Sequence, residues 1–147
     1  MTLTAEQPFE DAAAAIVAER SDAVFALRES VLDTTDIERV HRMRVATRRL
    51  RAALEVFAPA LDRKEGKRAL AEVKALAGAL GERRDRDVQL ERLARLAADT
   101  AGPEHHAVEL LVAELRGEQE HANEILADAL RHAKRARLRQ RLARLSR

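Results

Sequence analysis

The 147-residue sequence contains no cysteine, tryptophan or tyrosine, and only three phenylalanines. Without cysteine, the chain cannot form disulfides, thiolate zinc sites or a cysteine nucleophile. The scarcity of aromatic side chains removes the stacking surfaces that single-strand nucleic-acid binders use. Three prolines and five glycines leave few breaks in regular structure, and strand-forming residues are scarce. These absences favour long helices that approach closely through small side chains.

Long apolar segments are also missing. No stretch approaches the roughly 18 apolar residues of a membrane-spanning helix, and the start lacks the basic and apolar regions of a signal peptide. We therefore expect a soluble protein that is not exported and has no membrane partner. The lack of cysteine fits a reducing cytoplasm.

Motifs for catalysis and metal binding are absent as well. The sequence has no glycine-rich phosphate loop and no nucleophile elbow, and its five histidines show no HExxH-type spacing. Asp85 and Asp87 are two residues apart on a predicted helix, so they point in different directions and do not form a Mg²⁺ site. We expect neither an enzyme nor a cofactor or metal site.

Charge is unevenly distributed along the chain. The net charge is only +2, yet residues 1–38 hold nine acids and two bases, whereas residues 131–147 hold eight bases and no acid. Arginine supplies 23 of the 27 basic residues, and its planar guanidinium suits bidentate phosphate binding. This asymmetry predicts either a polyanionic partner or strong pairing within the chain.

Apolar spacing predicts an all-α fold with a single helical domain over residues 1–147. Thr35 or Asp36 is expected to cap the second helix, with Glu38 completing a capping box with Thr35. Short connections between long helices predict an antiparallel four-helix bundle. After a polar leader at residues 1–8, the expected helices span about 9–32, 36–58, 64–99 and 104–145.

The second helix combines a core stripe with a row of cations. Residues 40–57 contain no glycine or proline, and their apolar positions alternate three and four residues apart. A second set falls within an arc of roughly 80° beside this stripe, where only Glu55 offers a negative charge. The set is either a solvated basic face or an anion-binding surface, and it consists of His41, Arg44, Arg48 and Arg51.

Charged residues interrupt the apolar stripe of the third helix. On a helical wheel, Arg84 and Asp87 fall on the stripe that contains Leu76 and Leu80. Charges at core positions are unfavourable unless they are paired or bind a ligand. We therefore expect either an internal Arg84–Asp87 ion pair or a polar patch that faces the cations of the second helix.

The end of the fourth helix is strongly basic. Cations at this position stabilise the helix dipole, so the simplest interpretation is structural. In an antiparallel bundle the fourth helix would neighbour the first and third, so its basic end could offset the acidic first helix or extend a cationic surface. The residues are Arg131, Lys134, Arg135, Arg137, Arg139 and Arg141.

Two segments resemble the motifs of the CHAD family, the conserved histidine α-helical domain. They are VHRMRVATRRLR at residues 40–51 and LGERRDRDV at residues 80–88. The resemblance implies an all-α fold of two four-helix bundles around a basic groove that binds inorganic polyphosphate. It also implies a CYTH-type triphosphate-processing partner and adds polyphosphate granules to the expected cytoplasmic location.

The same resemblance implies that basic side chains on three helices contact polyphosphate. These are His41, Arg44, Arg48 and Arg51 in the second helix, Arg84 in the third, and Lys134 and Arg137 in the fourth.

The family domain is about twice as long as this chain, so the resemblance covers one half of the two-bundle fold. From the resemblance we expect either a shortened form, a naturally short member, or one of two copies that pair. A half domain should expose an apolar patch, so we expect a homodimer. The alternatives to polyphosphate binding are RNA or DNA binding through the same basic surface and a purely structural helical scaffold.

Overall fold

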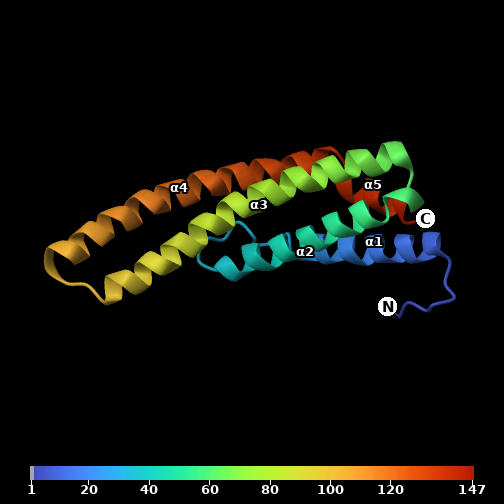
Figure 1. The fold of residues 1–147 in the computed structure, drawn as a ribbon. Helices are drawn as coiled ribbons and strands as arrows, with labels where there is room; N and C mark the ends of the chain where they lie inside the picture. The colour runs from blue at the N-terminus through green and yellow to red at the C-terminus, as the bar shows by residue number, and fades with distance from the viewer. Residues whose placement is uncertain (1) are drawn as a thin grey trace.

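The structure, a computed structural model, describes residues 2–147 and is built from helices joined by short connections (Figure 1). No strand occurs within these residues, so the predicted all-α class is confirmed. A single 3₁₀ turn, η1 (Ala58–Ala60), joins the second and third helices. The α-helices are α1 (Phe9–Ala26), α2 (Ile37–Val56), α3 (Arg63–Ala98), α4 (Gly102–Arg135) and α5 (Leu138–Leu145).

Helix α3 is the centre of the arrangement. It packs against α4 along much of its length and also contacts α2 and α5, whereas α1 packs against α2 and α5. Helix α4 makes no close backbone contact with α1 or α2 in the described part of the chain. The far ends of α3 and α4 extend past the shorter helices as a projection (Figure 1). We use the name distal hairpin for residues 88–118, which comprise the end of α3, the turn after it and the start of α4.

The first helix ends at Ala26 and not near residue 32 as predicted. The chain then forms turns in which Ser30 adopts a positive φ of 60°. Val31 is nevertheless fully buried in the core. Val24, Leu27 and Val31 therefore have helical spacing because they share one core, although the helix itself ends before Val31. Apolar spacing predicts which residues are buried more directly than it predicts the backbone conformation.

The predicted fourth helix is two helices, because the chain turns after Arg135. Arg137 adopts the left-handed conformation at φ 54°, and Arg141 Nε donates a hydrogen bond to the carbonyl oxygen of Ala136 at 2.9 Å. The turn places Leu138 and Leu142 of α5 in the core, where both are buried. The part of this segment that neighbours α1 is therefore α5.

The start of α2 confirms one capping prediction and contradicts another. Asp36 is the N-cap residue, but no side chain caps the helix, so the Thr35–Glu38 capping box does not form. Asp33 instead accepts hydrogen bonds from the Thr35 amide at 2.9 Å and from its hydroxyl at 2.7 Å. These bonds lower the pKa of the Asp33 carboxyl and engage the hydroxyl that the capping box required.

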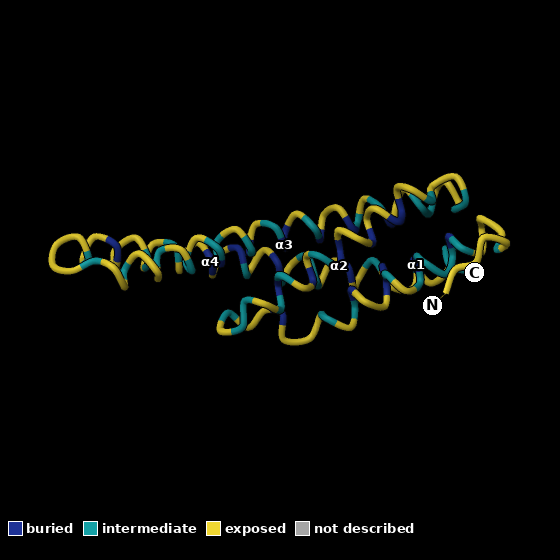
Figure 2. The backbone as a smooth tube through the Cα atoms, turned by 60° about the horizontal axis from the view of Figure 1, so that its bottom comes forward, coloured by how far each residue is buried: buried dark blue, intermediate teal, exposed yellow. Residues whose placement is uncertain are grey.

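The core lies between α1, α2, α3 and α5, and Leu126 and Ala133 of α4 join it. Val40, Met43 and Leu50 of the predicted α2 stripe are buried, as is Thr47, whose hydroxyl donates to the Met43 carbonyl at 2.8 Å. Figure 2 shows buried residues concentrated in this region and mostly exposed residues on the distal hairpin. Residues 2–8 precede the first helix, and Met1 of the predicted leader lies outside the described residues.

Candidate anion-binding site

The basic groove is a hollow of about 270 Å³ between α2 and α3. One wall comes from three of the predicted α2 cations. The other comes from α3, which adds Lys74 and the small residues Ala77 and Gly78. A Cβ atom at Gly78 would meet nothing within 4 Å, so the floor of the groove is open. The groove is lined by Arg44, Arg48, Arg51, Lys74, Ala77 and Gly78.

Two of these cations are available for a ligand. Arg44 and Arg48 are exposed and form no ion pair with any acid in residues 2–147. At the other end of the groove, Arg51 Nε lies 3.0 Å from Glu55 Oε1, and Lys74 Nζ lies 3.8 Å from the same oxygen. One carboxylate thus faces two cations, and the two further cations have no acidic partner in the described part of the chain.

His41 lies one helical turn before Arg44 but does not line the groove. It is half-buried, and its Nδ1 atom is buried without a hydrogen-bond partner. Because this nitrogen is buried, it is not itself open to a ligand in the groove. The predicted role of His41 in anion binding stays a prediction.

Arg84 does not occupy the core position that the helical wheel assigned to it. Its side chain is 15% exposed, and its Nη1 lies 4.0 Å from Glu38 Oε1. Glu38 is one turn before His41 on α2, so this contact places Arg84 near the His41 end of the cation row. The predicted Arg84–Asp87 ion pair is wrong, because Arg83 takes the place of Arg84.

Arg83 and Asp87 form the buried ion pair of α3. Arg83 Nε lies 2.9 Å from Asp87 Oδ1, and both side chains are 0% exposed. The spacing Val73, Leu76, Leu80, Arg83, Asp87 continues the alternation of three and four residues that marks a packed seam. That alternation is the signal that distinguishes Arg83 from its neighbour.

Two α4 side chains complete this pair, and sequence reasoning missed both. Gln119 Nε2 donates to Asp87 Oδ1 at 2.7 Å, and Arg83 Nη1 donates to Asn123 Oδ1 at 2.6 Å. Asn123 Nδ2 in turn donates to the Leu32 carbonyl at 2.9 Å. We call Arg83, Asp87, Gln119 and Asn123 the buried network. It joins α3 to α4 and to the connection that precedes α2.

Lys134 and Arg137 are not brought together with the other predicted contacts. Both are exposed, neither lines the basic groove, and α4 has no close backbone contact with α2 in the described residues.

Several neighbours of Lys134 and Arg137 pair with acids instead. Arg141 Nη1 lies 3.7 Å from Glu65 Oε2 of α3, and Arg139 Nη2 lies 3.8 Å from Asp22 Oδ1 of α1. The basic end thus offsets negative charge on α1 and α3.

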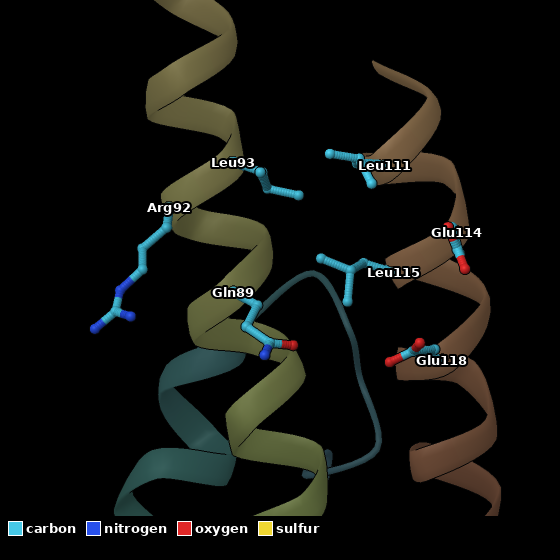
Figure 3. Close-up of a pocket in the computed structure, with 7 residues that line it drawn as sticks. All are labelled: Gln89, Arg92, Leu93, Leu111, Glu114, Leu115 and Glu118. Atoms are coloured by element: carbon cyan, nitrogen blue, oxygen red, sulfur yellow. The ribbon is translucent and has the colours of Figure 1, made fainter. Parts of the chain in front are cut away.

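A larger hollow of about 530 Å³ lies on the distal hairpin (Figure 3). Leu93 of α3 and Leu111 and Leu115 of α4 point into the space between the two helices. Glu114 and Glu118 lie at its α4 edge, so the local charge disfavours an anion. This hollow is a separate, largely apolar feature.

The side chains and helices of residues 2–147 show neither a metal-binding cluster nor a membrane-spanning segment. No group of three or more histidine, aspartate or glutamate side chains is placed to hold a metal ion in this range. Within the same range, no helix combines the length and the apolar character needed to cross a membrane.

Comparison with known families gives a match over nearly the whole chain. The model of the CHAD domain matches residues 15–147, a range that includes the basic groove and the buried network. The chain belongs to the CHAD family. CHAD domains are associated with polyphosphate binding and are not known as catalytic domains. Searches of curated proteins and of solved structures found no match to this CHAD chain.

Proposed function

We propose that this protein binds linear inorganic polyphosphate through the basic groove, with Arg44 and Arg48 as the principal contacts. The observation that carries the proposal is that these two cations are exposed and unpaired beside an open floor. They lie about 6 Å apart along the helix axis. A chain with about one negative charge per phosphate can contact both guanidinium groups, each of which can donate two parallel hydrogen bonds.

The remaining predicted contacts extend this site in two directions. Arg84 lies near His41 through its contact with Glu38, so both would act on a chain that continues past Arg44. Lys134 and Arg137 lie outside the groove. In this proposal they act only on a polyphosphate long enough to reach the end of α4.

Nucleic acid is the competing ligand for a basic surface. The chain has no tryptophan or tyrosine, and its phenylalanines are engaged elsewhere. The rings of Phe9 and Phe57 lie 5.4 Å apart, and Phe25 lies under the guanidinium of Arg139. No aromatic side chain lines the groove, so it supports contact with phosphates and not base stacking.

Titration with long-chain polyphosphate at several salt concentrations tests this function. The two unpaired cations, Arg44 and Arg48, predict that log affinity falls with log salt with a slope of about −1.4, from roughly 0.7 per phosphate contact on a single-stranded polyanion. Mixed-sequence RNA at matched charge should compete poorly. Absence of binding at low salt would contradict the proposal, and equal competition by RNA would replace it with general polyanion binding.

We also propose that two copies of the chain pair through the distal hairpin. Leu96, Leu110 and Leu111 are 48%, 60% and 51% exposed there. Arg92 of α3 and Glu114 of α4 are among the residues around the hollow, and Figure 3 shows their charged groups on the outer sides of the two helices. A twofold arrangement that sets α3 against α4 of the second copy would bring these opposite charges together.

Light scattering at high micromolar concentration tests this pairing. We expect the mass of a dimer for the wild type and of a monomer for Leu111→Glu, because the substitution places a charge in the apolar surface. A monomeric wild type would contradict the proposal.

Two further proposals rest on the family resemblance. They are association with a CYTH-type triphosphate-processing protein and a cytoplasmic location at polyphosphate granules.

A further inference from the structure

Glu55 holds the two cations at one end of the basic groove. Its Oε1 atom lies 3.0 Å from Arg51 Nε on α2 and 3.8 Å from Lys74 Nζ on α3. An anionic oxygen between cations of two facing helices has the position that a phosphate oxygen would take in this groove. Glu55 does not itself line the groove, but its carboxylate contacts both cations at the end farther from His41.

Exposure shows how firmly this carboxylate is held. The side chains of Arg51, Glu55 and Lys74 are 45%, 44% and 48% exposed. Ion pairs with this much solvent access contribute little to stability, so a ligand of higher charge density can displace the carboxylate. Arg44 and Arg48 have no such competitor within residues 2–147.

We propose that Glu55 is a built-in competitor that restricts anions to the Arg44–Arg48 part of the groove, and that Lys74 becomes a further phosphate contact when Glu55 is displaced. This inference rests on the proposed polyphosphate-binding function. A short anion can bind to Arg44 and Arg48 alone. A longer chain must displace Glu55 to gain Arg51 and Lys74, so Glu55 affects affinity and the preferred chain length.

The consequence for binding follows from charge. Glu55 repels a bound polyanion, and it also pairs with Arg51 and Lys74, two cations that the polyanion could otherwise contact. Replacing the carboxylate with a neutral amide should raise polyphosphate affinity roughly three- to fivefold, the effect of removing one unit of repulsion at about 5 Å in a water-like environment. The salt slope should steepen by about 0.7 for each cation that is released.

The matched pair of variants is Glu55→Gln and Glu91→Gln. Glu91 forms an exposed i,i+4 ion pair with Arg95 on the distal part of α3, so both substitutions break one such pair and change the net charge equally. Glu91 is 17 residues from Lys74, about 25 Å along the helix. Only Glu55→Gln should raise the affinity for polyphosphate, because only this substitution removes a negative charge beside the groove. Circular dichroism checks that both variants keep wild-type helicity.

Lys74→Ala in the Glu55→Gln background identifies the released contact. Titrations with long-chain polyphosphate at one moderate salt concentration should show a gain for Glu55→Gln and loss of much of it in the double variant. Equal affinities of Glu55→Gln and Glu91→Gln would overturn the role of Glu55, and a gain that survives Lys74→Ala would overturn the role of Lys74. If the wild type does not bind polyphosphate, the proposed function itself fails and this inference falls with it.

Discussion

Arginine side chains lie at the interfaces of α3 with both α4 and α2, but they are buried and paired at one interface and exposed at the other. Toward α4, Arg83 is fully buried, and its guanidinium contacts Asp87 and Asn123. Toward α2, Arg44 and Arg48 are exposed and without acidic partners in residues 2–147. A buried charge has to be satisfied by the protein because burial removes its water, whereas an exposed charge stays available to a ligand. Burial therefore separates structural arginines from candidate binding arginines better than sequence position does.

The buried network also connects the two sides. Asn123 donates to the Leu32 carbonyl, which lies in the connection between α1 and α2. The network therefore helps to hold the chain that leads into the cation-bearing helix. Arg83 Nη2 and Asp87 Oδ2 have no hydrogen-bond partner among the side chains and backbone of residues 2–147, so each charged group depends on few protein contacts. We expect the network to be sensitive to the loss of any single member.

The largest expected effect on stability comes from breaking this network. Asp87→Ala would leave the Arg83 guanidinium buried without its counter-charge, which should lower the free energy of unfolding by roughly 3–5 kcal/mol. Urea denaturation followed by circular dichroism measures the change. Asp85→Ala is the matched control, because Asp85 is exposed and two residues away. We expect it to change stability by less than about 0.5 kcal/mol.

The double variant Arg83→Met with Asp87→Leu tests whether the unpaired charge, and not the change of side chain at this position, causes the loss of stability. Apolar side chains of similar volume often replace a buried ion pair without loss of stability, so the double variant should be more stable than Asp87→Ala. If it is as unstable as Asp87→Ala, the unpaired charge is not the cause of the destabilisation.

The regular parts of α2 and α3 could be predicted from the sequence. The α2 stripe is periodic and free of glycine and proline, so both the core residues and the cation row beside them followed from the 3.6-residue period. In α3, a helical wheel with the same period placed Arg84 at the core position that Arg83 occupies in the structure. A straight helical wheel drifts from a seam that repeats every 3.5 residues, and this drift shifted the core position by one residue.

Features that depend on contacts between helices could not be predicted in the same way. Lys74 lines the basic groove because of how α3 is aligned against α2. Gln119 and Asn123 belong to the buried network because of how α4 is aligned against α3. The break at Arg137 has no glycine or proline to indicate it. That break redirects α5 onto α1, and Lys134 and Arg137 lie away from the groove.

The double variant Arg44→Ala with Arg48→Ala should have the smallest effect on stability and a large effect on polyphosphate binding. Both side chains are exposed and unpaired, so helicity should be unchanged and the free energy of unfolding should change by less than about 0.5 kcal/mol per residue. The matched control is Arg42→Ala with Arg49→Ala, which removes the same charge from exposed positions outside the groove.

Titration of these two double variants and the wild type with long-chain polyphosphate at one moderate salt concentration is the most direct test of the basic groove. We predict that binding is abolished in the Arg44/Arg48 variant and persists in the Arg42/Arg49 variant. Equal affinity of the Arg44/Arg48 variant and the wild type would contradict the assignment of the groove as the polyphosphate site.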